Sequence, residues 1–309
     1  MSDPSSGHPA VSGAQHQIGH GLQRVVVSEV GATLREFTVD GRVVVDGFGP
    51  TELCRGGRGQ VLAPWPNRLG DGRYEFDGTS AQAALDEPAR HNAIHGLVRW
   101  LPWQLLSRGQ NVVLMGCVLH PQPGYPWRID LQVEYRLGSA GLSVSATATN
   151  VSGNPAPFGI GFHPYLTVGT PTIDTARLRL DARRRLVTDE RGLPTGSASV
   201  VGTDFDFSNG RLIGATRLDT AFFDLARDDA GIARVELDQP GGASASVWMD
   251  ERFPYVMAFS ADTVEVPRRR ESLAVEPMSC PPDALRSGTD LTRLEPGASW
   301  SGRWGISTT

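Results

Sequence analysis

Polar and apolar residues alternate strictly in two neighbouring runs, Asp130-Leu131-Gln132-Val133-Glu134-Tyr135-Arg136-Leu137 and Leu142-Ser143-Val144-Ser145-Ala146-Thr147-Ala148-Thr149-Asn150. An alternation with a period of two is typical of a strand that buries one face. The residues between the runs, Gly138-Ser139-Ala140-Gly141, form a short turn signal of the kind that joins antiparallel strands. Residues 130–150 therefore predict an antiparallel β-hairpin.

Segments with the sequence pattern of β-strands extend along most of the chain. Short runs rich in β-branched residues are broken by glycine and aspartate at residues 24–28, 33–39, 42–45, 177–180, 235–237, 243–248 and 255–260. The chain also has 36 glycines and 22 prolines, and it shows no long helical period. These features predict an all-β fold.

The domain organisation follows from composition. Residues 1–20 are rich in Ser, Gly, Pro and His and carry almost no large apolar side chains, so we expect a disordered tail. No internal repeat and no linker interrupts the rest of the chain, so residues 21–309 are expected to form a single domain.

Charge and composition exclude several classes of function. All 29 basic residues are arginine, whereas Schiff-base aldolases, pyridoxal-phosphate enzymes and Walker A nucleotide-binding loops each need a lysine. The net charge is -5 and the arginines are scattered, which argues against a nucleic-acid partner. The three cysteines form no paired motif, and neither a signal peptide nor an apolar run of about 18 residues is present. We therefore expect a cytoplasmic protein without a membrane segment.

Two segments in the first third of the chain carry candidate binding residues. Asn67 and Arg68 follow a stiff Pro-Trp-Pro run, and the planar guanidinium suits two neighbouring hydroxyls or a carboxylate. His91 and His95 have the spacing of a helical zinc pair, but no glutamate follows His91 and no third ligand is apparent. His95 is better interpreted as a loop imidazole that hydrogen-bonds a polar ligand, without a metal.

Two further segments carry candidate proton-transfer groups. His163 lies in an apolar, glycine-punctuated run, where an imidazole with a pKa of about 6.5 in water is placed so that its surroundings decide its protonation. Glu276 follows the apolar residues 273–275 and precedes Pro277, so we expect it to project from the end of a strand into a cleft.

Together these segments resemble the aldose 1-epimerase (galactose mutarotase) family, over most of residues 55–285. The resemblance rests on Asn67-Arg68, His95-Gly96, His163-Pro164-Tyr165, Leu218-Asp219-Thr220-Ala221-Phe222 and Glu276-Pro277. It implies a large twisted antiparallel β-sandwich, the galactose mutarotase-like supersandwich, with its site in a shallow cleft. It also implies a sugar substrate, no cofactor, no metal, and a monomer or homodimer.

The resemblance also implies roles for the site residues. His163 is expected to act as the general acid and Glu276 as the general base in the interconversion of α and β anomers of a hexose, while Asn67, Arg68, His95 and Asp219 hold the sugar. The chain departs from the best-studied members at two positions, since it has Leu97 after His95-Gly96 and Met257 where a glutamine stands on a late strand.

Three alternatives stay open at this point. Arg99 could contact a charged substituent, as in a hexose-6-phosphate 1-epimerase, or it could brace its loop. A catalytically silent carbohydrate-binding protein could share the fold. A glycoside hydrolase would use two carboxylates, here Asp219 and Glu276, but it leaves His163 without a role.

Overall fold

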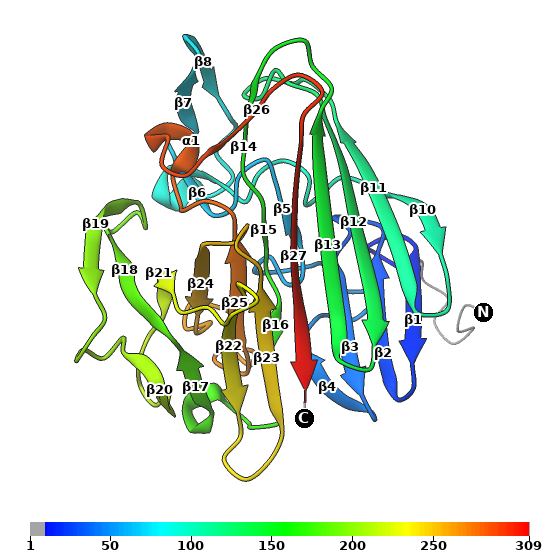
Figure 1. The fold of residues 1–309 in the computed structure, drawn as a ribbon, viewed down its shortest axis with the longest axis vertical. Coiled ribbons are helices and arrows are strands. Elements are labelled where there is room, and N and C mark those ends of the chain that lie inside the picture. Colours follow the sequence, from blue (N-terminus) through cyan, green and yellow to red (C-terminus); the bar gives the residue numbers. More distant parts are fainter. Residues whose placement is uncertain (1–9, 309) are drawn as a thin grey trace.

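The structure is a computed structural model that describes residues 10–308, and β-strands make up most of it (Figure 1). The prediction of an all-β protein is confirmed. In the described part of the chain, helical structure is limited to α1 (Ala284–Ser287) and the 3-10 turns η1 (Pro88–Arg90) and η2 (Ile173–Thr175). None of these helices is long and apolar enough to cross a membrane.

The larger of the two main sheets is 12-stranded and antiparallel, and it carries most of the candidate site. Its main path runs in the order β1 (Gln15–His20), β2 (Gln23–Ser28), β3 (Leu34–Val39), β4 (Arg42–Val45), β16 (Tyr165–Leu166), β25 (Leu273–Met278), β24 (Tyr255–Phe259), β21 (Asp219–Leu225), β18 (Ala182–Thr188) and β19 (Pro194–Ser199). Two short strands join it off this path: β15 (Gly161–Phe162) pairs with β25, and β5 (Val61–Leu62) pairs with β15.

The second main sheet is 9-stranded and contains the predicted hairpin. Its order is β10 (Gln104–Arg108), β11 (Val112–Leu119), β12 (Ile129–Gly138), β13 (Gly141–Asn150), β27 (Ser299–Thr308), β23 (Ser244–Met249), β22 (Ala233–Asp238), β17 (Arg177–Leu180) and β20 (Phe207–Leu212). The hairpin is confirmed in detail, because β12 and β13 pair from Ile129 opposite Asn150 to Gly138 opposite Gly141.

Three two-stranded sheets complete the fold. They are β6 (Arg68–Gly70) with β9 (Asn92–Ile94), β7 (Arg73–Phe76) with β8 (Thr79–Gln82), and β14 (Ala156–Phe158) with β26 (Thr292–Leu294). The β6–β9 pair supplies one wall of the candidate site.

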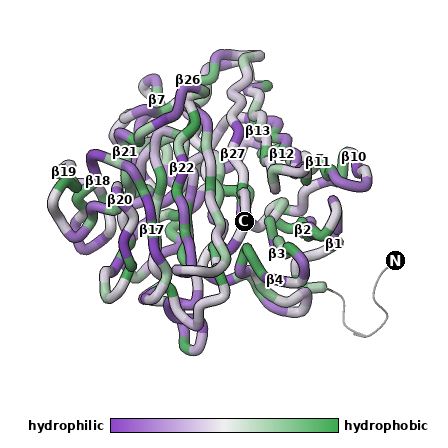
Figure 2. Tube along the Cα trace, turned by 60° about the horizontal axis from the view of Figure 1, so that its bottom comes forward, coloured by the Kyte–Doolittle hydropathy of each residue, from purple (hydrophilic) through white to green (hydrophobic). Residues whose placement is uncertain are grey.

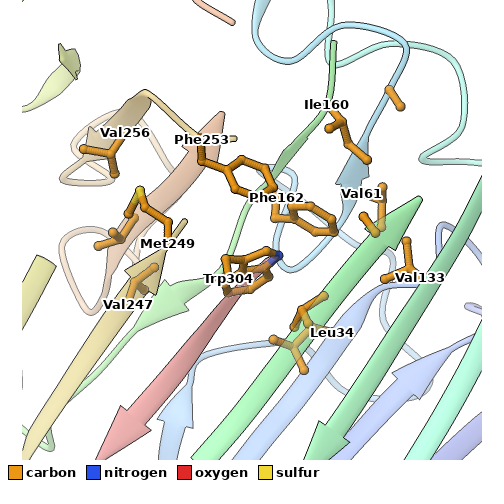
Figure 3. Close-up of a cluster of buried hydrophobic side chains, with 14 of the residues drawn as sticks. Leu34, Val61, Val133, Ile160, Phe162, Val247, Met249, Phe253, Val256 and Trp304 are labelled. Carbon is orange, nitrogen blue, oxygen red and sulfur yellow. The ribbon is translucent and has the colours of Figure 1, made fainter. Parts of the chain in front are cut away.

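The two main sheets share one hydrophobic core. Leu34 of β3 and Val61 of β5 come from the larger sheet, whereas Val133 of β12 and Trp304 of β27 come from the smaller one, and all four belong to the same buried cluster (Figure 3). Strands β1–β4 and β10–β13 form two layers on the same side of the molecule (Figure 2). Two sheets that bury their inner faces against each other make the β-sandwich that the sequence led us to expect.

The N-terminal expectation needs a correction. Gln15–His20, which we assigned to a disordered tail, form β1 and pair along their whole length with β2. Ile18 is buried in the main core, and His16 is buried as well. The segment is polar because only alternate side chains reach the core, while its backbone hydrogen bonds come from β2. The expectation for residues 1–9 lies outside the described residues.

Candidate active site

The six predicted site residues line one cavity of about 350 Å³. They are Asn67, Arg68, His95, His163, Asp219 and Glu276. Glu276 and Asp219 come from β25 and β21 of the larger sheet, and Arg68 begins β6. A volume of this size is at the lower end of the range for small-molecule sites and suits a compact polar ligand.

His163 and Glu276 form a buried pair in the lining of the cavity. His163 Nε2 lies 3.3 Å from Glu276 Oε1, and the two side chains are 5% and 2% exposed. The sheet register places them: Gly161 of β15 pairs with Met278 and Tyr165 of β16 pairs with Ala274, so His163, midway between, faces Glu276. Residues far apart in the sequence are thus brought together by strand pairing.

The position of Glu276 corrects one expectation. Glu276 lies inside β25, which continues through Pro277 to Met278, and not at the end of the strand. Proline is tolerated because β15 and β16 pair with β25 only on either side of Glu276 and Pro277, so no ladder hydrogen bond is lost along that edge. The gap between β15 and β16 is also where His163 enters the site.

Burial dominates the protonation of this pair. Desolvation, reinforced by the positive charges of Arg58 and Arg99, lowers the pKa of His163 to about 3. Desolvation also raises the pKa of Glu276 well above its usual value, and the Asp219 carboxylate adds to that rise while Arg68 opposes it. Both shifts favour the neutral forms, so between the two pKa values the imidazole and the carboxyl group hold one ionisable proton between them.

One oxygen of the pair is left without a partner. Glu276 Oε2 is buried and accepts no hydrogen bond from any described residue. A buried acceptor without a donor costs free energy unless a ligand or water supplies one. The Glu276 carboxyl group therefore keeps an unused acceptor in a residue that lines the cavity.

His95 is held in a defined orientation by Asn67. The backbone N–H of Asn67 donates to His95 Nδ1 at 3.2 Å, and the backbone N–H of His95 donates to the Asn67 carbonyl at 2.8 Å. Burial lowers the pKa of His95 well below its usual value, so the neutral ring carries its proton on Nε2. His95 thus offers one hydrogen-bond donor, and its ring meets the His163 ring edge to face at 5.3 Å.

Asn67 itself shapes the backbone. Its φ is 56°, in the left-handed region, and its side-chain oxygen accepts a hydrogen bond from the backbone N–H of Arg68 at 2.9 Å. Asparagine is one of the few residues other than glycine that adopts this conformation readily.

Arg68 is fixed by two carboxylates, one of which sequence reasoning missed. Its guanidinium donates to both oxygens of Glu87, with Nε 3.0 Å from Oε2, and Nη1 lies 3.4 Å from Asp219 Oδ2. Glu87 lines the cavity but belongs to no recognisable motif, and only the tertiary structure places it beside Arg68. Asp219 is 40% exposed, so it is the carboxylate of this group that a ligand reaches most easily.

Arg99 lines the same cavity and braces the loop around it. Its Nη2 lies 2.6 Å from Asp86 Oδ2, and Asp86 also accepts the backbone N–H of Ile94 at 2.7 Å. An anionic substituent would have to compete with Asp86 for this guanidinium.

Two other predicted features have clear locations. His91 contacts Asp71 at 2.8 Å and does not line the cavity, and no group of three His, Cys, Asp or Glu within residues 10–308 could hold a metal ion. Met257 lies directly across from Glu276 and packs with Ala221, Tyr255 and Met278. Met257 therefore belongs to a small buried apolar cluster and is not among the residues that line the cavity.

Similar sequences are found among known proteins. The sequence model of the family described as Aldose 1-epimerase matches residues 15–307. The uncharacterized protein YihR of Escherichia coli is 35% identical over 288 residues, which cover 93% of this chain and 90% of YihR. The aldose 1-epimerase of Escherichia coli is 27% identical over 162 residues, which cover 50% of this chain and 46% of that protein.

Solved structures share the fold. The GalM/aldose epimerase homologue from C. elegans superposes with a TM-score of 0.85 at 18% identity, covering 96% of this chain and 98% of that one. Galactose 1-epimerase from Lactobacillus acidophilus has a TM-score of 0.79 at 19% identity, covering 96% and 94%. At such identities the comparison concerns the fold alone, and it agrees with the expected galactose mutarotase-like sandwich.

Proposed function

Because the chain belongs to the aldose 1-epimerase family, we propose that it interconverts the α and β anomers of a free hexose by acid and base catalysis. The observation that carries this proposal is the buried pair of His163 and Glu276, 3.3 Å apart in a cavity of about 350 Å³. An imidazole and a carboxyl group that share one proton can donate to one oxygen of a sugar while accepting from another.

The proposed reaction moves two protons and forms no bond to the protein. When the proton of the pair lies on His163, its Nε2 donates that proton to the ring oxygen while the Glu276 carboxylate removes the proton from the C1 hydroxyl, and the bond between C1 and the ring oxygen breaks. This step gives the open-chain aldehyde, whose carbonyl group can rotate, and leaves the proton of the pair on Glu276. Closure on the opposite face reverses both transfers and restores the pair. Each positioned group can contribute about 10²- to 10⁴-fold.

The other polar groups would hold the sugar. Arg68 and Asp219 present a donor and an exposed acceptor side by side, which suits neighbouring hydroxyl groups. His95 would add a neutral donor close to His163. Asn67 would serve mainly by holding His95 and Arg68 in place, since its backbone and side chain bond both residues. Such positioning converts binding free energy into reaction rate.

Polarimetry of freshly dissolved α-D-glucose and α-D-galactose, with hexose 6-phosphates in parallel, tests the proposal. We expect the rate of mutarotation of at least one free hexose to rise in proportion to protein concentration. Binding without acceleration would support the silent binding protein, and a preference for the phosphates would support the hexose-6-phosphate epimerase. Release of a new sugar from a glycoside would support the hydrolase.

The shared proton predicts an unusual pH profile. The pair gains a second proton, and loses its base, only below the lowered pKa of His163 at about 3. It loses its single proton, and hence its acid, only above the raised pKa of Glu276. We therefore expect kcat/KM to be level through the mildly acidic and neutral range. A fall centred at pH 6 to 7, where an ordinary histidine titrates, would contradict the shared-proton pair.

Gly57 provides a steric test of the position of His163. A Cβ atom on Gly57 would lie 2.7 Å from His163 Cδ2, so we expect Gly57→Ala to displace the imidazole and lower kcat by about 10- to 100-fold. Gly78→Ala is the matched control, because Gly78 has nearly the same φ, +74° against +71°, but nothing lies within 4 Å of its added Cβ. Equal activities of the two variants would show that the position of His163 is not critical.

A further inference from the structure

His163 rests on a side chain that the proposed reaction does not use. The imidazole stacks on the Tyr165 ring with centroids 5.0 Å apart and an angle of 9° between the planes. The two residues are separated by one position in an extended segment, so their side chains share a face. A stacked neighbour restricts the tilt of the imidazole, and therefore the direction in which Nε2 points.

The Tyr165 ring is in turn fixed at its edge and on its face. Its hydroxyl donates to the Gly56 carbonyl at 2.9 Å, and burial raises its pKa well above the usual value, so the hydroxyl stays neutral. The guanidinium carbon of Arg58 lies 4.0 Å from the ring centroid, a cation–π distance. Residues 56–58 thus hold Tyr165 and also pass next to His163.

Arg58 is a buried cation with its own ion-pair and hydrogen-bond partners. It is 4% exposed, its Nη1 lies 2.7 Å from Asp46 Oδ2, and it also contacts the Ser272 hydroxyl at 3.2 Å. Ser272 donates to the same Asp46 oxygen, and Arg268 binds the other one. A buried charge with this many partners stays in place, so Arg58 is a permanent positive charge close to the site.

We propose that Tyr165 and Arg58 are positioning residues: Tyr165 sets the plane of the His163 ring, and Arg58, packed on the Tyr165 ring, holds that ring and acts on His163 through its positive charge. This inference rests on the proposed function of His163. The titratable and charged groups around His163 are Glu276, His95, Tyr165, Arg58 and Arg99, with Arg68 and Asp219 acting on Glu276. Among them, Arg58 and Arg99 are the permanent cations that lower the pKa of His163.

The two contributions can be separated by substitution. Tyr165→Leu removes the ring, whereas Tyr165→Phe keeps the stack and loses only the hydroxyl. We expect Tyr165→Leu to lower kcat by about 10- to 100-fold with KM nearly unchanged, because a misdirected acid slows the chemical step. Tyr165→Phe should recover most of this loss. Equal kcat values for Tyr165→Leu and the wild type would overturn the role of the stack.

Arg58→Met tests the charge. Asp46 keeps Arg268 and Ser272 as partners in this variant, so no carboxylate is left alone. We expect the pKa of His163 to rise by about one unit from its depressed value, and the acidic limb of the pH profile to move by the same amount. Arg58→Lys retains the charge and should restore the wild-type limb. Arg55→Met is the control, since Arg55 belongs to the same loop but is 69% exposed and pairs with Glu265.

Titration of the His163 imidazole by NMR needs no substrate and keeps the two hypotheses apart. If wild-type protein turned over no aldose, the proposed function would fail, while the difference between Arg58→Met and wild type would still measure the effect of the charge. A His163 pKa that is unchanged in Arg58→Met, or raised equally in Arg55→Met, would overturn the role of Arg58. If Arg58→Met does not fold, as judged by circular dichroism, the comparison of Tyr165→Leu with Tyr165→Phe tests whether the side chains behind His163 matter for kcat.

Discussion

Glu276→Gln is expected to lower kcat for mutarotation by about 10²- to 10⁴-fold while sugar binding largely survives. The amide has nearly the same shape and can still hydrogen-bond a hydroxyl, but it cannot accept a proton at neutral pH. The buried position makes replacement by water inefficient, because the carboxyl group is 2% exposed. Polarimetry gives kcat, and calorimetry with a hexose gives the dissociation constant.

Two controls make this result specific. Glu134→Gln changes a glutamate that pairs with Arg136 on β12 of the other main sheet, and it should leave kcat unchanged.

The stability of the Glu276→Gln variant supplies the second control. In the folded state the Glu276 carboxyl group keeps its proton, whereas in the unfolded chain it loses the proton above the usual pKa of 4.5. The free energy of unfolding therefore falls as the pH rises from 4.5 towards the raised pKa. Glu276→Gln should therefore be at least as stable as wild type at pH 8. A wild-type rate in this variant would refute the assignment of the base.

His163→Gln is expected to cause a loss of similar size, because it removes the proposed proton donor but keeps a polar group in its place. The double variant His163→Gln, Glu276→Gln should lose little more than the worse single variant. Groups that act as one unit show this strong non-additivity, since removal of either already disables the proton exchange. If the loss of kcat in the double variant equalled the product of the two single losses, His163 and Glu276 would act independently.

A second histidine offers the matched control for His163→Gln. His91 is 66% exposed, contacts Asp71 and lies outside the cavity. His91→Gln should retain the wild-type kcat. A comparable loss in His91→Gln would mean that the effect arises from general damage to the fold.

Strand patterning made much of the fold predictable. The β12–β13 hairpin is local, its alternation is regular, and its turn lies between two glycines, so no distant information is needed. β1 was missed for the opposite reason. Its residues are polar on one side, and what stabilises it is pairing with β2 and burial of Ile18 in a core assembled from distant strands.

The residues of the candidate site show the same contrast between a local sequence pattern and contacts with distant residues. His163 and Glu276 stand out in the sequence because titratable groups in apolar strands are unusual. Glu87 and Arg58 do not stand out, because an acid in a polar loop and an arginine among glycines have no distinctive local pattern. Their importance comes from the partners they meet, Arg68 for Glu87 and Tyr165 for Arg58.

By itself, then, the sequence indicated an all-β chain, a family resemblance and two titratable side chains in apolar segments. Only the tertiary structure decided that these two side chains face each other, that Glu276 lies within β25 and not at its end, and that both side chains are buried. The reason is physical. Alternation and turn residues act between neighbours in the chain, whereas pKa values and proton transfer depend on distances and on the exclusion of water, which arise only when β15, β16 and β25 are paired.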